Sequence, residues 1–350
     1  MRGVVFPGDR QVELMSFDDP TPGPDDAVLE IKASGFCGSD LRFYREGHMQ
    51  ALRWNYPDKA AEGPIIGGHE PCGIVAALGK SVNQKALRVG DRVMVHHYDG
   101  CRHCDQCRTG WSQLCEYGST VYGQTAHGAH APYMKVPANT LVHLPDEVSF
   151  SAGAAIACGT GTAYSALVRL DLSARDTLAV FGLGPVGQSA VQFGAAMGAK
   201  VIAVDISSQR IARAPEFGAI HAIDSNKVDP VQAIRELTGG KGVSLAIDCT
   251  NALAARQAAV RSTMTWGKIA LVGVGGEVTL DVMQDLVLKQ RTVLGSWTFS
   301  SVIMGACARF VADHGIDVDK QFTHRWKLDD AAHAYREFDK QTGGKAVFEL

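Results

Sequence analysis

The stretch Asp176-Thr-Leu-Ala-Val-Phe-Gly-Leu-Gly-Pro-Val-Gly187 decides the fold of this chain. Its first residues form a compact apolar run of strand length, and a helical pattern covers 184–197. Gly182 permits a tight turn, Gly184 lets the backbone approach a pyrophosphate, and Gly187 lets the helix pack closely on the strand. Because the start of such a helix offers free N–H groups and partial positive charge, the segment predicts a phosphate-binding strand–loop–helix unit.

The next strand indicates which dinucleotide would bind. The apolar run 200–204 ends at Asp205, and 205 − 182 = 23 residues separate this carboxylate from the first loop glycine. A carboxylate there accepts hydrogen bonds from both hydroxyls of an adenosine ribose and repels a 2′-phosphate, which favours NAD over NADP. Pro185 and Val186 complete the expected cofactor loop. A glycine-rich turn without a nucleotide stays open as the alternative.

Strands and helices alternate around this unit. Further apolar runs at 244–248 and 268–272 are separated by helical stretches, which is typical of a parallel sheet covered on both faces. Before residue 150 the pattern is different, with short strands expected at 27–32, 73–78 and 91–95. We therefore expect an α/β chain with a second, β-rich part.

Composition limits the class of protein. The 350 residues suggest roughly two domains, and the 46% hydrophobic content is that of a globular chain. The net charge of −3 gives no basic surplus for nucleic acid. The uncharged stretch 148–168 consists mainly of small residues, so we expect no membrane span. The N-terminal apolar run is too short for a signal-peptide core, which predicts a cytoplasmic protein with reduced thiols.

Four of the nine cysteines lie within 15 residues, with the spacing C-x2-C-x2-C-x7-C. They are Cys101, Cys104, Cys107 and Cys115. Four thiolates fill a tetrahedral zinc shell and leave no position for water, so the pattern favours a structural zinc site. An iron–sulfur cluster and a redox-active C-x-x-C pair remain open alternatives.

Three further motifs carry metal-binding residue types. They are Gly35-Phe-Cys-Gly-Ser-Asp40, Gly67-Gly-His-Glu70 and Ala157-Cys-Gly-Thr160. Together with the cysteine cluster, the glycine loop with Asp205 and the closing Gly344-Lys-Ala-Val347, they occur in the order found in one family. The chain resembles the zinc-dependent medium-chain alcohol dehydrogenases, of the medium-chain dehydrogenase/reductase superfamily, over nearly its whole length.

The resemblance implies a domain organisation. A Rossmann domain with a doubly wound parallel sheet would be inserted in a β-rich, GroES-like catalytic domain. The expected parts are 1–154 with a structural zinc lobe at 96–118, the NAD-binding domain 155–297, and a catalytic return segment 298–350. The family also implies two zinc ions per chain and a homodimer or homotetramer.

The resemblance further implies the catalytic site. The ligands of the catalytic zinc would be Cys37, His69 and Cys158, the Cys₂His set of alcohol dehydrogenases. Asp40 would hold the second ring nitrogen of His69, and Glu70 would lie near the metal and ligate it transiently. Zinc would polarise the substrate oxygen while Ser39 relays the proton and NAD exchanges hydride. Many relatives have a histidine where this chain has Arg42, so the outer end of the relay departs from the family pattern.

The remaining contacts are also implied by resemblance. The expected cofactor contacts outside the glycine loop are Arg210 near the ribose, Val272, Gly273 and Val274 at the carboxamide, and Lys345 at the pyrophosphate. The expected pocket residues are His97, Trp54 and Trp297. Polyol dehydrogenases often have a glutamate at the position of Cys158, which favours a plain alcohol as substrate. A polyol or amino alcohol of the sorbitol or threonine type is the alternative, and a nucleotide-binding relic without chemistry is opposed by the intact zinc ligands.

Overall fold

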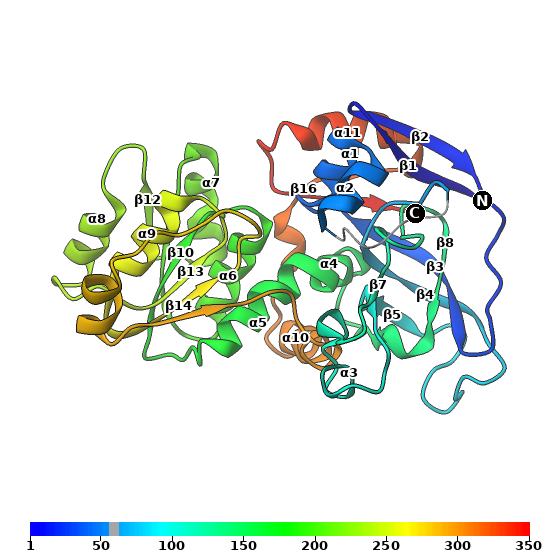
Figure 1. Ribbon diagram of the computed structural model, residues 1–350, viewed down its shortest axis with the longest axis horizontal. Helices are drawn as coiled ribbons and strands as arrows, with labels where there is room; N and C mark the ends of the chain where they lie inside the picture. The colour runs from blue at the N-terminus through cyan, green and yellow to red at the C-terminus, as the bar shows by residue number, and fades with distance from the viewer. Residues whose placement is uncertain (56–62) are drawn as a thin grey trace. The chain divides into compact units, whose positions relative to one another are not determined.

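The computed structural model describes residues 1–55 and 63–350, and in these the chain divides into two compact units (Figure 1). Unit 1 consists of Met1–Cys158 and Phe299–Leu350, and unit 2 of Gly159–Thr298. Both chain termini therefore belong to unit 1. The boundaries expected from the sequence, after residues 154 and 297, lie four residues and one residue before those of the structure.

Unit 2 contains a six-stranded parallel sheet in its described residues, in the order β12-β11-β10-β13-β14-β15. The strands are β10 (Thr177–Phe181), β11 (Lys200–Asp205), β12 (His221–Asp224), β13 (Val243–Asp248), β14 (Thr263–Leu271) and β15 (Thr292–Gly295). Counted from β10, this is the order 3-2-1-4-5-6 of a Rossmann sheet. The predicted Rossmann fold is confirmed, and the buried apolar runs at 177–181 and 200–205 form its adjacent inner strands β10 and β11.

The first helix of unit 2 precedes β10, and the others lie between successive parallel strands. The helices of this unit are α5 (Gly161–Arg169), α6 (Pro185–Ala196), α7 (Ser208–Arg213), η4 (Ala214–Phe217), α8 (Pro230–Leu237), α9 (Leu253–Arg261), η5 (Val282–Leu286) and η6 (Val287–Lys289). The predicted helix 184–197 is α6, with Gly184 as its N-cap and Pro185 in its first turn. Strand β14 begins five residues before the predicted position, and its irregular start contains Trp266 at φ 67°.

Unit 1 is built on a sheet of seven described strands, in the order β16-β17-β3-β4-β5-β9, with β8 also paired to β3. The strands are β3 (Asp26–Gly35), β4 (Glu70–Leu78), β5 (Arg92–Val95), β8 (Tyr133–Pro137), β9 (Leu141–His143), β16 (Phe322–Trp326) and β17 (Lys345–Glu349). All pairs are antiparallel except β16 with β17. Strands β3 and β4 contain the predicted strands 27–32 and 73–78, and β5 begins one residue later than the predicted strand 91–95.

The other elements of unit 1 surround this sheet. They are the hairpin β1 (Arg2–Gly8) and β2 (Gln11–Ser16), the pair β6 (Tyr98–Asp99) and β7 (Thr120–Val121), α1 (Asp40–Glu46), α2 (His48–Asn55), α3 (Asp105–Arg108), η1 (Ser112–Leu114), η2 (Ala138–Thr140), α4 (Phe150–Ala155), α10 (Ser301–Asp313), η7 (Val318–Gln321), η8 (Leu328–Asp330) and α11 (Ala331–Asp339). A π-helical segment, η3 (Ile156–Thr160), follows α4.

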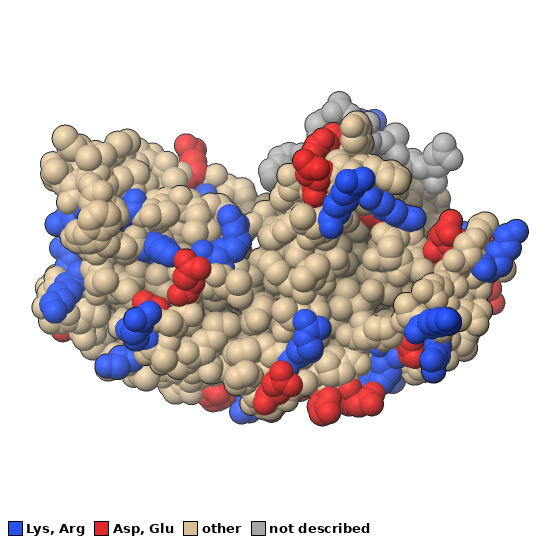
Figure 2. Space-filling model, turned by 90° about the horizontal axis from the view of Figure 1, so that it is seen from below, with Lys and Arg blue, Asp and Glu red and all other residues tan. Residues whose placement is uncertain are grey.

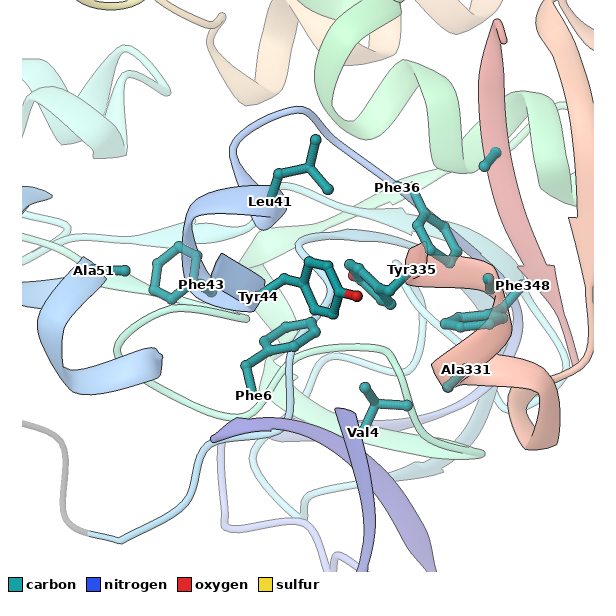
Figure 3. Packing of buried hydrophobic residues seen from close by; sticks show 12 residues of the cluster. Val4, Phe6, Phe36, Leu41, Phe43, Tyr44, Ala51, Ala331, Tyr335 and Phe348 are labelled. Atoms are coloured by element: carbon teal, nitrogen blue, oxygen red, sulfur yellow. The ribbon is translucent and has the colours of Figure 1, made fainter. Parts of the chain in front are cut away.

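An aromatic cluster joins the two ends of the chain within unit 1 (Figure 3). Phe36 follows β3, and its ring lies 4.7 Å from that of Tyr335 on α11 and 4.6 Å from that of Phe348 on β17. Tyr44 on α1 faces Tyr335 from the other side, at 5.4 Å between ring centroids. Since each fully buried aromatic ring contributes a large apolar area, this packing fixes the C-terminal segment against the loop that follows β3.

The surface carries charges of both signs. Basic and acidic side chains are interspersed on the face shown in Figure 2, in keeping with the small net charge of −3. Among the helices in the described part of the chain, none has the length and apolar character needed to cross a membrane.

Candidate metal centres and dinucleotide site

Four potential metal ligands meet in unit 1 although they come from separate segments. Cys37 lies just after β3, His69 and Glu70 lie at the start of β4, and Cys158 lies in the π-helical segment η3. One donor atom from each residue lies within 4.8 Å of all the others. Short π-helical segments occur often at functional sites, and this one places a thiol inside unit 1 at the end of the buried helix α4.

The spacing of the donor atoms fits a tetrahedral zinc ion. The sulfurs of Cys37 and Cys158 are 3.9 Å apart, and the Cys158 sulfur is 3.5 Å from His69 Nε2. Zinc–sulfur bonds of about 2.3 Å and zinc–nitrogen bonds of about 2.05 Å place tetrahedral ligands about 3.8 Å (S–S) and about 3.6 Å (S–N) apart. Two thiols and one imidazole thus have the spacing of three tetrahedral zinc ligands, and the Glu70 carboxylate is a fourth potential donor within 4.8 Å of them.

Asp40 orients this ligand set. One of its carboxylate oxygens lies 2.8 Å from His69 Nδ1, and the other accepts the Cys37 N–H at 2.9 Å. Burial by itself lowers the pKa of His69, but Asp40 and the Cys37 sulfur raise that pKa well above its usual value. The Cys158 thiol and then His69 lower the pKa of Cys37, against the opposing effect of burial. The arrangement thus supports a thiolate at Cys37 and keeps Nε2 of His69 directed at the cluster.

Glu70 and Lys345 form a buried ion pair behind the cluster. Lys345 Nζ lies 2.5 Å from the Glu70 carboxylate, and their side chains are 1% and 0% exposed. The ammonium also donates to the Phe36 carbonyl at 3.2 Å. Burial raises the pKa of Glu70 to about 7, although Lys345 acts to lower it. A Cβ on Gly35 would lie 2.0 Å from a Glu70 oxygen, so only glycine leaves room for this carboxylate.

This position differs from the one expected for Lys345. The resemblance placed its side chain at the pyrophosphate, whereas the structure buries it inside unit 1 with its ammonium held by Glu70 and Phe36. A buried ammonium requires a counter-charge and acceptors, and this carboxylate and carbonyl provide both.

Ser39 is an exposed residue whose hydroxyl lies next to the metal-ligand cluster. Its Oγ lies 3.5 Å from His69 Nε2 and does not cap helix α1, although Ser39 is the N-cap residue. Arg42 forms an ion pair with Glu46 at 3.1 Å. His48 is buried, and its Nε2 lies 2.6 Å from the Gln124 carbonyl.

The three expected pocket residues have different positions. His97 is 1% exposed, with its ring 5.1 Å from the His69 ring and its Nδ1 3.2 Å from the Ala157 carbonyl. It therefore lies beside the metal cluster, and burial followed by the charge of His69 lowers its pKa well below the usual value. Trp297 is 42% exposed and lies just after β15 in unit 2. Trp54 is in α2, but its side chain lies outside the described residues.

The four cysteines at 101–115 form a second cluster, with every sulfur within 4.8 Å of the others. The Cys101–Cys107 and Cys104–Cys115 sulfur pairs are each 4.0 Å apart. These distances fit one tetrahedral ion, since a multi-iron cluster would hold its four sulfurs farther apart. Backbone N–H groups, such as that of Cys104 to the Cys101 sulfur at 3.3 Å, stabilise thiolate charge in the lobe.

The glycine loop of unit 2 has the geometry of a pyrophosphate cradle. Gly182 has φ 86°, which favours glycine, and a Cβ on Gly187 would lie 1.7 Å from the Gly182 carbonyl oxygen. A Cβ on Gly184 would meet nothing within 4 Å, so open space lies next to the backbone at the start of α6. The loop residues Pro185 and Val186 form the first turn of that helix. The residues therefore fit a bound dinucleotide phosphate.

Asp205 ends β11 beside this loop. Its carboxylate accepts the Leu183 N–H at 2.5 Å and the Ser207 N–H at 2.7 Å. Arg210 on α7 lies 3.9 Å from the same carboxylate. The structure thus brings the expected ribose-binding acid, the expected basic residue and the glycine loop together.

The segment 272–274 follows β14 at the carboxyl end of the sheet. The N–H groups of Val272 and Gly273 both donate to the Asp248 carbonyl, at 2.9 and 3.1 Å, and Val274 is 65% exposed. Two residues that the sequence reasoning did not select, Asp248 and Arg256, are buried beneath this segment and form an ion pair at 3.1 Å.

Comparison with known proteins identifies the family of both parts of the chain. The model of the alcohol dehydrogenase GroES-like domain matches residues 23–146, and that of the zinc-binding dehydrogenase domain matches residues 185–313. An uncharacterized zinc-type alcohol dehydrogenase-like protein of Escherichia coli K12, YphC, is 37% identical, covering 99% of this chain and 98% of its own. Sorbitol dehydrogenase of Bacillus subtilis is 32% identical, and the match covers 81% of this chain and 78% of that protein. The structure of a protein described as a short chain alcohol dehydrogenase from Escherichia coli CFT073, in complex with NADH, has a TM-score of 0.87 at 25% identity, and the match covers 100% of this chain and 99% of that one.

A GroES-like unit with a zinc-binding donor set and a Rossmann unit together define a zinc-binding dehydrogenase. The chain belongs to the zinc-dependent medium-chain alcohol dehydrogenases and is an NAD-dependent zinc oxidoreductase. The resemblance inferred from the sequence motifs is confirmed.

Proposed function

We propose that this protein oxidises a small alcohol with NAD and reduces the corresponding aldehyde or ketone in the reverse direction. The observation that carries the proposal is the set of Cys37, His69 and Cys158 donors at zinc-ligand distances, with the hydroxyl of the exposed residue Ser39 at 3.5 Å from His69 Nε2. This set combines a three-ligand metal site with a group that can carry a proton.

Residues of unit 1 have three separate roles in the proposed reaction: metal binding, orientation of a ligand and proton transfer. A zinc ion held by Cys37, His69 and Cys158 supplies a Lewis acid for the substrate oxygen. Asp40 holds His69 in the tautomer that presents Nε2, because its carboxylate lies at Nδ1. Ser39 takes the alcohol proton and passes it outward.

The proton path ends in water in this proposal. Arg42 has taken the position of a family histidine, and a guanidinium cannot accept a proton in a protein. His48 is engaged by the Gln124 carbonyl, and burial lowers its pKa. Ser39 is itself exposed, so solvent can receive the proton directly.

Unit 2 is the proposed NAD-binding domain. The glycine loop 182–187 receives the pyrophosphate, Asp205 and Arg210 the adenosine ribose, and the backbone of 272–274 the nicotinamide carboxamide. The open space at Gly184 and the position of Asp205 beside the loop support this assignment. A dinucleotide held by these residues would supply the hydride acceptor for oxidation and the hydride donor for reduction.

A polyol or amino alcohol is the second candidate substrate class. It is supported by the 32% identity to a sorbitol dehydrogenase. Cys158 favours the plain alcohol, because polyol dehydrogenases often have a glutamate there.

Metal content and assembly complete the proposal. We propose two zinc ions per chain, one catalytic and one structural, and a cytoplasmic homodimer or homotetramer. The edge position of β15 in its sheet supports subunit pairing.

A substrate panel tests the proposal directly. Simple primary and secondary alcohols, sorbitol-like polyols and threonine are each assayed with NAD and NADP by NADH or NADPH absorbance. We expect turnover of a plain alcohol with NAD. Higher turnover on sorbitol or threonine would select the second candidate, and a preference for NADP would refute the assignment of Asp205.

Metal analysis of the same preparation is the companion measurement. Two zinc ions per chain are expected, and Cys37→Ser should retain one zinc while losing activity. Zinc present only at the four-cysteine lobe of the wild type would overturn the proposed catalytic centre.

A further inference from the structure

Unit 2 contains a buried arginine that the proposed site does not use. Arg256 lies on α9 and is 5% exposed. Its Nε donates to the Asp248 carboxylate at 3.1 Å, and one terminal nitrogen donates to the Gly273 carbonyl at 2.6 Å. The other terminal nitrogen reaches the Glu277 carbonyl at 3.5 Å. A guanidinium is thus held between the end of β13 and the loop that follows β14.

The Asp248 carboxylate that binds this guanidinium also accepts hydrogen bonds from Thr250. Asp248 is 0% exposed and accepts hydrogen bonds from the N–H and hydroxyl of Thr250, at 3.0 and 2.6 Å. Arg256 supplies the positive charge that a buried carboxylate needs, and its planar fork reaches two carbonyls at once. The pair therefore connects α9 and β13 to the loop.

The loop closes tightly over the guanidinium. A Cβ on Gly276 would lie 3.2 Å from an Arg256 terminal nitrogen and 2.2 Å from the Asn251 carbonyl oxygen. Asn251 also donates through its side chain to the Val274 carbonyl at 2.9 Å. The backbone of 272–277 is consequently pinned at several atoms by the segment 248–256.

These bonds leave a specific pair of backbone groups available. They use the N–H groups of Val272 and Gly273 and the carbonyls of Gly273 and Val274. In the described part of the chain, no hydrogen bond engages the Val272 carbonyl or the Val274 N–H. One acceptor and one donor are what a primary carboxamide requires.

We propose that Arg256 is a positioning residue for the nicotinamide half of the cofactor. By holding the Gly273 and Glu277 carbonyls against Asp248, it fixes the peptide groups of Val272 and Val274 in the orientation that the carboxamide recognises. The inference rests on the proposed function, because it takes unit 2 to be the NAD-binding domain. The inference adds Arg256 to the residues that the proposed cofactor site depends on, although Arg256 itself would touch neither cofactor nor substrate.

Binding measured without turnover tests this role. NADH carries the nicotinamide, and ADP-ribose has the same adenosine and pyrophosphate without it, so their dissociation constants are compared by calorimetry on the full chain. We expect Arg256→Gln to raise the dissociation constant of NADH about tenfold while changing that of ADP-ribose by less than about twofold. Arg256→Lys keeps the charge at Asp248 but lacks the two-carbonyl fork, so we expect a smaller effect of the same selectivity.

A matched control lies on the same helix. Arg261 pairs with Asp285 at 3.3 Å and its side chain is 45% exposed, so Arg261→Gln removes the same charge from α9 without touching the loop. Both dissociation constants should stay unchanged in this variant. The melting temperature of each variant is recorded, and Arg256→Lys carries the test if Arg256→Gln does not fold.

Different outcomes of these measurements would contradict the positioning role of Arg256 and the proposed NAD-dependent function. Equal weakening of both ligands, or no weakening of NADH, in the folded Arg256 variants overturns the positioning role alone. Wild-type protein that binds neither NADH nor ADP-ribose overturns the proposed function together with the inference.

Discussion

Replacing Lys345 with methionine tests the buried ion pair behind the metal cluster. The substitution keeps an unbranched apolar side chain as far as the ε position but removes the ammonium that lies 2.5 Å from Glu70 and donates to the Phe36 carbonyl at 3.2 Å. Glu70 is then left in an apolar environment without its counter-charge. No water can replace the lost partner readily, because both side chains are at most 1% exposed.

The size of the effect follows from this burial. Removing one partner of a buried pair costs about 3–5 kcal/mol, far more than the loss of a surface pair, because the remaining carboxyl must either stay charged without solvent or take up a proton that it does not hold in the unfolded chain. Adding Glu70→Gln removes that carboxyl and its cost. The double variant should therefore recover about 2 kcal/mol or more relative to Lys345→Met alone, which is a coupling energy typical of residues in direct contact.

Urea unfolding of the zinc-loaded protein measures this difference. The transition of unit 1 is followed by release of zinc to a coloured chelator, since both metal clusters lie in that unit. Lys340→Met is the matched control, because Lys340 pairs with Glu337 on the surface at 2.7 Å. We expect the control to leave the urea midpoint unchanged.

One result would refute the buried-pair interpretation. If Lys345→Met leaves the midpoint unchanged but weakens NADH and ADP-ribose binding strongly, then Lys345 acts at the pyrophosphate, as the sequence resemblance implied. A lower midpoint with unchanged ADP-ribose binding supports the position seen in the structure.

Three further perturbations address other parts of the molecule. Asp205→Ala should reduce the preference for NAD over NADP by about tenfold, because the carboxylate that repels the 2′-phosphate is lost; the ratio of kcat/KM for the two cofactors measures it. Ser39→Ala should lower hydride-transfer turnover about a hundredfold at unchanged zinc content, and wild-type turnover would exclude the relay. Burial lowers the pKa of His130 from 6.5 to about 4, so the folded state resists protonation and stability falls as pH decreases from 6.5 towards 4. The full loss is about 3 kcal/mol, and His130→Gln should flatten that part of a plot of unfolding free energy against pH, which an unchanged slope would contradict.

The dinucleotide fold could be predicted because its signal is local. Gly182, Gly184, Gly187 and Asp205 lie within 24 residues. Gly182 and Gly187 are each required by the geometry of a single turn. The structure shows the same demand, since a Cβ at Gly187 would lie 1.7 Å from the Gly182 carbonyl oxygen. Short-range motifs of this kind need no knowledge of the tertiary fold.

The metal centre could not be predicted from spacing alone. Cys37 and Cys158 are separated by 121 residues, yet their sulfurs are 3.9 Å apart. No periodicity connects a residue after β3 with one in a π-helical segment, so the sequence indicated this ligand set only through family resemblance. Lys345 shows the limit of that route, because the resemblance predicted a cofactor contact and the structure buries its ammonium beside Glu70.

Arg256 shows that one long-range feature did leave a trace in the sequence. It shares a helix face with Ala259 and Val260, three and four residues later, and all three side chains are buried against the sheet. A charge on the core-facing side of a helix requires a buried partner, and Asp248 stands at the end of the apolar strand β13 that α9 follows. Helical spacing thus marks Arg256 as unusual. Only the tertiary structure, which brings α9 next to the loop after β14, shows that the guanidinium donates to the Gly273 and Glu277 carbonyls.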